Sequence, residues 1–273
     1  MGGVVGAVSG LLGIGGGVLV VPFLYFLMAG SGWSGLMVLS EHEAALAHAT
    51  SLALIIPTAL SGVLAFRRAG ALELPPLGPL AVGAGMGAVV GAWVATSSPA
   101  AVLKAAFGFF LLIMAARLLG ILPSPEGAAE KGVRGVGLGP GLVGGGMIGF
   151  FSAVLGVGGG LVAIPILLRW GGISLERVVP VSLVLVIFAS LAGTGGYALA
   201  GSGVDGLPSG ALGYVHLPAL VAMLPGAIFL APLGAAWNRR MPVAVLRRVF
   251  GVLLLVVGAR VLWLETVVWL TTF

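Results

Sequence analysis

Two matching glycine triplets are the residues of this chain best suited to bind a ligand. The triplets are Gly15, Gly16 and Gly17 near the start, and Gly158, Gly159 and Gly160 in the second half. A helix that begins directly after a glycine run presents unpaired backbone N–H groups and the positive end of its dipole. No side chain keeps a ligand away from that backbone. The triplets therefore predict anion binding, although small residues at such positions also serve close helix packing in membranes.

Hydroxyl groups and one imidazole are spaced so that they can add to this site. Ser9 and Ser152 each precede a triplet by six residues, and each could donate to the anion or bond a backbone carbonyl instead. A polar stripe of His48, Ser51 and Thr58 follows the first triplet, and Thr50 stands next to Ser51. Ser182 is the counterpart of Ser51 in the second half. Substrate binding is therefore predicted for the following residues: Gly15, Gly16, Gly17, Thr50, Ser51, Gly158, Gly159, Gly160, Ser182, Ser9, Ser152 and His48.

His48 is the ionisable residue best placed inside the polar stripe. It could bind the anion or carry a coupled proton, because its charge changes near neutral pH. It could equally be a histidine hydrogen-bonded near the membrane surface to Glu43 or to a loop carbonyl. No Asp or Glu lies deep in a predicted span, which argues against a carboxylate proton relay. Coupling to protons through His48, coupling through the protonation state of the substrate, and transport without a coupled ion all stay open.

The composition sets these residues in a membrane. Hydrophobic residues make up 59% of the 273 residues and charged residues only 8%, against about 25% charged in an ordinary soluble domain. The formal net charge of +5 comes from arginines in short clusters between apolar runs, which are topology signals and no indication of nucleic-acid binding. The absence of cysteine excludes disulfides and thiolate metal sites. We expect a multi-pass protein of the cell membrane without a cofactor or a bound metal.

The chain is duplicated. The sequence around Gly13 returns around Gly156, at an offset of 143 residues, and the same offset relates Pro99 to Pro242 and Arg117 to Arg260. The predicted domains are therefore repeat 1 over residues 1–122, an inter-repeat linker over 123–139 and repeat 2 over 140–273. Duplicated halves of this size are typical of transporters whose site lies between the repeats.

Each repeat is predicted to hold three membrane-spanning helices and one glycine-rich segment. The spans are 44–66, 77–97, 99–120, 178–200, 217–237 and 243–264, each about 20 residues or more, which suffices for a hydrocarbon core of ~30 Å. The segments 2–29 and 139–170 are divided by their triplets into pieces too short to cross alone, as in broken or re-entrant helices. Most arginines fall on the cytoplasmic face only if these segments turn back to the side from which they start. Each repeat then crosses the membrane three times, so the second repeat is inverted relative to the first.

The paired glycine elements resemble a known family. Gly10-x-x-Gly13-x-Gly15-Gly16-Gly17-x-x-x-x-Pro22 is matched by Ala153-x-x-Gly156-x-Gly158-Gly159-Gly160-x-x-x-x-Pro165, and Ala49-Thr50-Ser51 follows the first element. These motifs resemble the sulfite exporter TauE/SafE family, and the resemblance runs from about Gly2 to Glu265. It implies a transporter of small sulfur-containing or carboxylate anions such as sulfite, sulfonates or sulfoacetate. Ala153 and Val181 depart from the stronger pattern of the first repeat.

Other motifs favour other classes of protein less well. Gly32-Trp33-Ser34-Gly35 matches the GxSG of intramembrane serine hydrolases, but Ser34 precedes a short loop and no helix long enough to bury a catalytic serine. Gly83, Gly87 and Gly91 form a GxxxG pattern that packs one span against a neighbouring span or against a second protomer.

We therefore expect an all-α polytopic membrane protein of two inverted repeats that moves a small anion by alternating access. The alternative is a passive anion channel of the same fold, and an intramembrane serine hydrolase is a distant third. The expected partners are the anion, the lipid bilayer, coupled protons or other ions, and a second protomer if the protein is a homodimer, but no nucleic acid.

Overall fold

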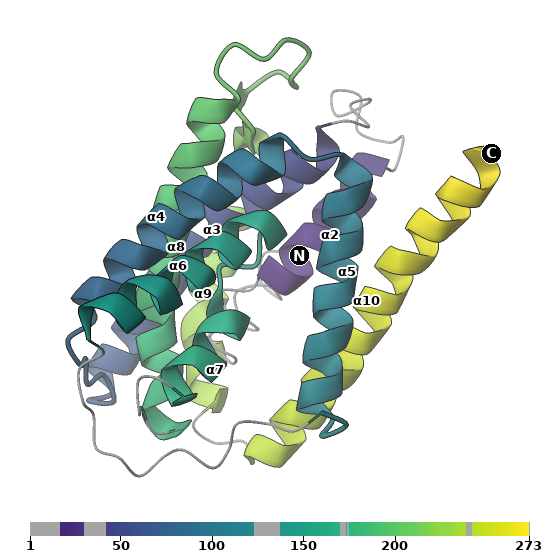
Figure 1. The fold of residues 1–273 in the computed structure, drawn as a ribbon. Coiled ribbons are helices and arrows are strands. Elements are labelled where there is room, and N and C mark those ends of the chain that lie inside the picture. The colour runs from purple at the N-terminus through teal and green to yellow at the C-terminus, as the bar shows by residue number, and fades with distance from the viewer. Residues whose placement is uncertain are drawn as a thin grey trace.

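Helices make up most of the computed structural model, which describes residues 17–29, 42–122, 137–169, 173, 175–238 and 242–272. The helices in chain order are α2 (Gly17–Ala29), α3 (Glu43–Arg68), α4 (Gly78–Thr96), α5 (Ala100–Leu118), α6 (Leu138–Leu155), α7 (Gly160–Arg169), α8 (Leu175–Ala200), α9 (Leu217–Asn238) and α10 (Val243–Thr272). One antiparallel hairpin, formed by β1 (Ala211–Leu212) and β2 (Val215–His216), precedes α9. Apart from this hairpin, the predicted α-helical class is confirmed (Figure 1).

Five of the described helices are long and apolar enough to cross a membrane: α3, α4, α5, α6 and, from Arg177 on, α8. Four of them coincide with predicted spans, and the remaining two predicted spans are the helices α9 and α10. The prediction that 139–170 consists of pieces too short to cross is wrong for α6. This helix has 18 residues and a length of about 27 Å. Its own glycines, Gly144 to Gly146, do not break it.

The glycines of α6 serve to pack it against α4. A Cβ atom added at Gly87 would lie 2.1 Å from the carbonyl oxygen of Gly146, and one added at Gly149 would lie 1.9 Å from that of Ala84. Gly83 and Gly91 approach Leu142 and Phe150 in the same way, so the contacts advance in step and the two helices run parallel. The GxxxG pattern thus packs α4 against a neighbouring helix of the same chain, which was one of the two predicted alternatives.

Helices that the sequence duplication relates to each other pack in antiparallel pairs. In the α5–α10 pair, Gly108 contacts Leu262 and Gly251 contacts Leu119. The repeat offset of 143 residues converts the first of these contacts into the second. In the α3–α8 pair, Gly62 contacts Leu183 and Gly193 contacts Leu52. When Ser51 is aligned with Ser182, Gly62 corresponds to Gly193 and Leu52 to Leu183, so the second contact is the counterpart of the first. An interface that exchanges its contacts in this way has an approximate two-fold axis.

The helix pair α6 and α7 starts from one end of the bundle and returns to it. Gly141, in the first turn of α6, lies against Pro79 at the start of α4, where an added Cβ would be 2.6 Å from Cβ of the proline. Arg177, near the start of α8, pairs with Glu73 at 2.6 Å, and Glu73 lies in the connection that leads from α3 to the start of α4. The chain therefore passes inward along α6, reverses, and is back at this end when α8 begins.

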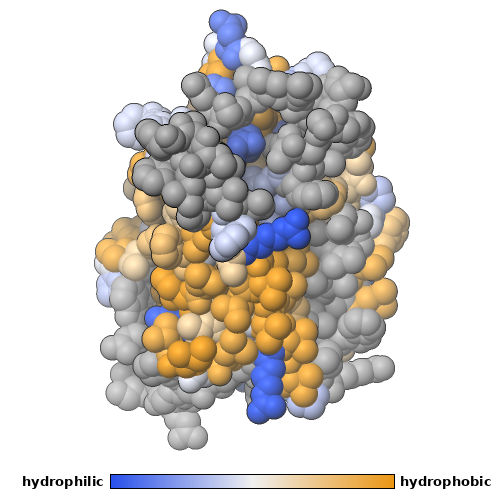
Figure 2. All heavy atoms as spheres, turned by 90° about the vertical axis from the view of Figure 1, so that its right-hand side faces the viewer, coloured by the Kyte–Doolittle hydropathy of each residue, from blue (hydrophilic) through white to orange (hydrophobic). Residues whose placement is uncertain are grey.

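The surface of α5 and α10 is apolar, as expected for helices that face lipid. Phe109 and Ile113 on α5 and Val252 and Val256 on α10 are exposed. Figure 2 shows this side of the molecule with a broad hydrophobic area and hydrophilic side chains above and below it. Together with the spanning helices, this surface identifies a multi-pass membrane protein.

Candidate functional site

The break between α6 and α7 lies where the second glycine triplet predicts it. Gly156 ends α6 in the left-handed conformation with φ of 65°, and Gly158 and Gly159 also have positive φ values of 77° and 74°. Side chains make this backbone conformation costly, whereas glycine adopts it readily. Residues 156 to 160 are buried, so the chain reverses inside the bundle.

Hydroxyl groups from two other helices satisfy the carbonyl groups at the end of α6. Ser51 of α3 donates to the carbonyl oxygen of Gly156 at 2.7 Å. Tyr197 of α8 donates to that of Ala153 at 2.9 Å. A helix end inside a membrane needs such partners because no lipid group replaces water as a donor. The hydroxyl hydrogen of Ser51 is thereby engaged in holding the break.

The amide side of the break is different. The carbonyl oxygen of Gly159 accepts hydrogen bonds from the N–H groups of Val162 at 3.0 Å and Ala163 at 2.7 Å, so Gly159 starts α7. For the amides of residues 157 to 161 we find no acceptor among the described residues, although these residues are buried. The start of α7 is therefore a group of buried N–H donors at the positive end of a helix dipole.

Ser152 adds a hydroxyl group to these donors. It lies on the last turn of α6, is fully buried, and its hydroxyl has no hydrogen-bond partner in the described part of the chain. A Cβ atom added at Gly159 would lie 3.1 Å from Cβ of Ser152, so the serine is adjacent to the start of α7. Buried polar groups normally have partners, and an unpartnered one beside unpaired amides indicates a place for an acceptor.

The glycine-rich element of the first repeat meets that of the second at this point. Gly17 is the first residue of α2, and a Cβ atom added there would lie 2.6 Å from the carbonyl oxygen of Gly156. Ile55 of α3 lies beside both Gly17 and Gly158. The other first-repeat residues predicted for the site, Gly15, Gly16 and Ser9, lie outside the described residues.

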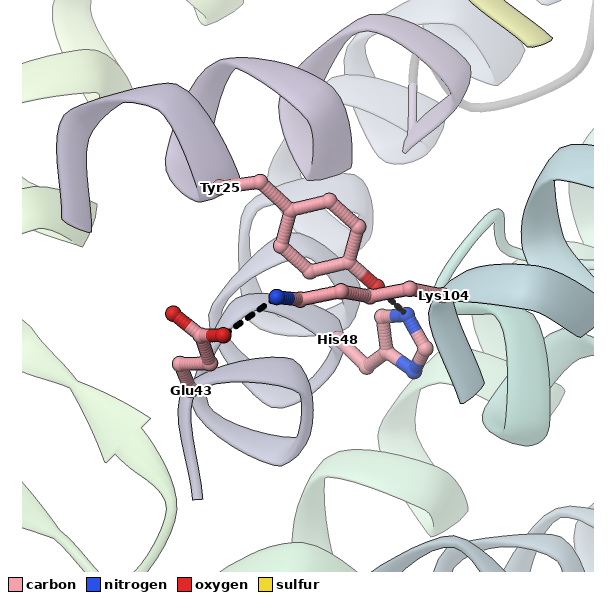
Figure 3. Close-up of polar contacts among 4 residues, drawn as sticks. All are labelled: Tyr25, Glu43, His48 and Lys104. Atoms are coloured by element: carbon pink, nitrogen blue, oxygen red, sulfur yellow. Dashed lines mark hydrogen bonds and ion pairs between the residues drawn. The ribbon is translucent and has the colours of Figure 1, made fainter. Parts of the chain in front are cut away.

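His48 lies on the break and is bonded to a tyrosine. The ring and backbone of His48 lie against Gly156, and its Nε2 atom is 2.6 Å from the hydroxyl oxygen of Tyr25 on α2. Figure 3 shows the tyrosine reaching from α2 to this histidine. Glu43, one of the partners expected for His48, pairs with Lys104 instead, so that expectation is wrong. The reason is that Glu43 lies in the first turn of α3, where the lysine of α5 reaches it (Figure 3).

Two of the predicted residues have other contacts in this conformation. The Thr50 hydroxyl accepts a hydrogen bond from the N–H of His216 at 2.9 Å and so holds the β-hairpin against α3. The Ser182 hydroxyl donates to the Val179 carbonyl within its own helix at 2.8 Å. Both residues are buried, and neither of these two bonds is made to a residue of α7. The structure thus brings Gly17, His48, Ser51, Ser152 and Gly158–Gly160 together.

His216 also starts α9. Its Nδ1 atom accepts a hydrogen bond from the N–H of Ala219 at 3.1 Å, which requires an unprotonated Nδ1. Burial of the side chain lowers the pKa of His216 below its ordinary value. The hairpin between α8 and α9 therefore keeps a neutral histidine next to Thr50.

Sequence reasoning missed the three residues that surround His48 and the break: Tyr25, Tyr197 and Lys104. The chain has only three tyrosines, and two of them lie within apolar segments. A hydroxyl in such a segment needs a partner, so these tyrosines were the available signal.

Comparisons with known proteins agree with this architecture. The family model described as "Sulfite exporter TauE/SafE" matches residues 1–261. The probable membrane transporter protein YunE of Bacillus subtilis (strain 168) is 24% identical over 278 residues, which cover 95% of this chain and 94% of that protein. A probable membrane transporter protein of Haemophilus influenzae is 24% identical over 258 residues, covering 94% of each chain.

A longer relative matches half of the chain. The probable membrane transporter protein MamO of Magnetospirillum gryphiswaldense is 32% identical over 142 residues, which are 50% of this chain and 20% of that protein. No solved structure matches the chain. The family model covers both repeats and the break between α6 and α7, and the chain belongs to the sulfite exporter TauE/SafE family of membrane transporters.

Proposed function

We propose that this transporter carries a small sulfur-containing oxyanion or organosulfonate, such as sulfite or sulfoacetate, and binds it at the start of α7. The observation that carries the proposal is the group of buried amides at residues 157–161 with the unpartnered hydroxyl of Ser152 beside it. An oxyanion with several oxygen atoms accepts hydrogen bonds from donors that converge from different directions. The name of the family, sulfite exporter TauE/SafE, includes one such anion.

The energetic argument favours an anion over a neutral solute. Buried N–H donors that lose water and gain no acceptor cost free energy, and a charged acceptor forms stronger bonds with them than a neutral one. Each such bond contributes about 1.5–3 kcal/mol, so loss of one donor weakens binding roughly tenfold or more. The dipole of α7 adds to the attraction.

The exchanged contacts of the equivalent helices support inverted repeats. Because α5 and α10 run antiparallel while the repeat relates one to the other, the approximate two-fold axis lies perpendicular to the helices. In a membrane protein such an axis lies in the plane of the membrane. The break at Gly156 meets Gly17 of the other repeat, and this contact supports a site at the boundary between the halves.

This arrangement favours alternating access. Rocking of one repeat against the other changes which membrane face reaches a site at their boundary. In this mechanism Ser51 and Tyr197 hold the end of α6, while His48 and Gly17 lie against the break at Gly156. Thr50 and Ser182 belong to the supporting structure of the site through their bonds to His216 and Val179.

Counterflow in proteoliposomes tests the proposed function. Vesicles with purified protein are loaded with unlabelled sulfite and exposed to a trace of labelled sulfite. A carrier accumulates the label transiently above the outside concentration, whereas a passive anion channel of the same fold only equilibrates it. Thermal-shift measurements with sulfite, thiosulfate, sulfoacetate and acetate identify the preferred anion, since a ligand of the native state raises its stability.

A further inference from the structure

A lysine lies within the helix bundle, near the break but outside the site described above. The ammonium group of Lys104 on α5 forms a hydrogen-bonded ion pair with Glu43 on α3 (Figure 3). The side chains are only 16% and 20% exposed, so water solvates neither charge fully. A charge at such a position requires a partner.

The ion pair is linked to the break through two rings in series, those of Tyr25 and His48. Nζ of Lys104 lies 5.6 Å from the centre of the Tyr25 ring, and the hydroxyl of Tyr25 bonds His48, which lies on Gly156. Phe107 of α5 contacts the rings of both Tyr25 and His48, with centroid distances of 6.1 and 6.2 Å. An anion at Lys104 is therefore separated from the break by the side chains of Tyr25, Phe107 and His48.

We propose that Lys104 recognises the transported anion before it reaches the break, and that Glu43 takes the place of the anion when none is bound. This inference rests on the proposed function. An ammonium group presents three donors to a carboxylate oxygen and to an oxyanion oxygen alike. Because the pair is partly exposed, an arriving anion can compete with the carboxylate for the same donors.

Glu43 can be released from the lysine without becoming an isolated buried charge. It stands in the first turn of α3, where the positive end of the helix dipole stabilises a carboxylate. Its partial exposure gives it contact with water. Lys104 has a flexible stem and a compact charge, which suits an exchange of partners better than a fixed two-point contact.

The duplication places a second cation at the corresponding position of the other repeat. The repeat offset of 143 residues relates Lys104 to Arg247, in the first turns of α10. Because α5 and α10 are antiparallel, these two positions lie at opposite ends of the helix pair. A positive residue at each end fits a path that an anion enters from either face of the membrane.

Three variants separate substrate recognition from a merely structural ion pair. The experiment measures sulfite binding to purified Lys104→Gln, Lys104→Arg and Glu43→Gln by thermal shift, and the half-maximal sulfite concentration for counterflow. We expect Lys104→Gln to bind sulfite about tenfold more weakly or worse, and Lys104→Arg to stay within a few-fold of the unmodified protein. Glu43→Gln should bind sulfite more tightly, because the competing carboxylate is gone.

A structural ion pair would behave differently, since removing either partner would then change sulfite affinity in the same direction. That result overturns the proposal. If a single variant fails to fold, the neutral pair Lys104→Gln with Glu43→Gln decides the matter, because it leaves no unpaired charge. We expect this double variant to bind sulfite about tenfold more weakly, and unchanged affinity would contradict the role of Lys104.

The unmodified protein shows which of the two proposals fails. Thiosulfate, sulfoacetate and acetate are tested beside sulfite at constant ionic strength. If none of the four anions stabilises the unmodified protein, the proposed function fails, and the role of Lys104 fails with it. If one of them binds and Lys104→Gln binds it equally well, the site at the break stands and the role of Lys104 alone is refuted.

Discussion

Gly159→Ala is the substitution that most sharply separates a required glycine from a replaceable one. Gly159 has a φ of 74°, and this left-handed conformation costs an alanine about 1–2 kcal/mol. The new Cβ atom would also lie 2.9 Å from the Ile148 carbonyl oxygen and 3.1 Å from Cβ of Ser152. With the displacement of these neighbours the total reaches about 2–3 kcal/mol, or roughly a 30- to 150-fold change in the unfolding equilibrium.

Gly195→Ala is the matched control. Gly195 lies on α8, has no neighbour within 4 Å of an added Cβ atom, and should be unaffected or slightly stabilised by alanine, by at most about 1 kcal/mol. Denaturant unfolding of both purified variants, with and without sulfite, measures the difference. We expect Gly159→Ala to lose stability and to bind sulfite at least about tenfold more weakly, because the methyl group approaches the Ser152 donor. If it unfolds and binds like Gly195→Ala, the break needs no glycine and the reasoning is refuted.

Three further predictions follow from packing and hydrogen bonds. Gly87→Val should lower the melting temperature strongly with or without sulfite, because its Cβ would lie 2.1 Å from a carbonyl oxygen of α6. Gly85→Val should not lower it, because the nearest neighbour of its Cβ is 3.8 Å away. Equal melting temperatures of the two variants would contradict the close α4–α6 packing. Ser51→Ala leaves a buried carbonyl without its donor and should cost about 1–3 kcal/mol of unfolding free energy, and an unchanged denaturation midpoint would show that the break does not depend on this bond. The lowered pKa of His216 means that the unfolded chain binds more protons than the folded chain, so the contribution of His216 to stability is present above about pH 6.5 and is lost as the pH falls. His216→Asn should weaken this pH dependence of the melting temperature. An identical pH profile of the two proteins would exclude a role of His216 in it.

The class of the protein and the position of the break were predictable from the sequence. Few charged residues over long apolar runs require a membrane, and a glycine triplet in such a run predicts a place where the helix stops. The structure has positive φ values at Gly158 and Gly159, which is the conformation that a tight reversal requires. The duplication also predicted which helices correspond, and the exchanged contacts of Gly108 and Gly251 follow the same offset.

The length of α6 was not predictable by the same rule. Gly144 to Gly146 precede the break and would weaken a helix in water, yet α6 continues through them. In a membrane the missing side chains permit close contact with another backbone, and the packing of α4 against these residues compensates. The sequence contains both kinds of glycine cluster, and only the neighbouring helix distinguishes them.

The partners of the polar side chains were also beyond a sequence argument. Glu43 and Lys104 are 61 residues apart, and Tyr25 and His48 are 23 residues apart on different helices. Helical periodicity places Ser51 on a face of α3, but only the tertiary structure brings the Gly156 carbonyl to its hydroxyl. Such contacts depend on how the helices pack, which no spacing within one helix determines.

Anomalous diffraction from crystals grown with selenite tests the central claim most directly. Selenite has the shape and charge of sulfite, and selenium marks its own position in the density. The account predicts a peak beside the start of α7, within hydrogen-bonding reach of the amides near Gly159 and Gly160 and of the Ser152 hydroxyl. A peak found only elsewhere would contradict the account, because it would show that the anion is bound at another site and that the glycines serve packing alone.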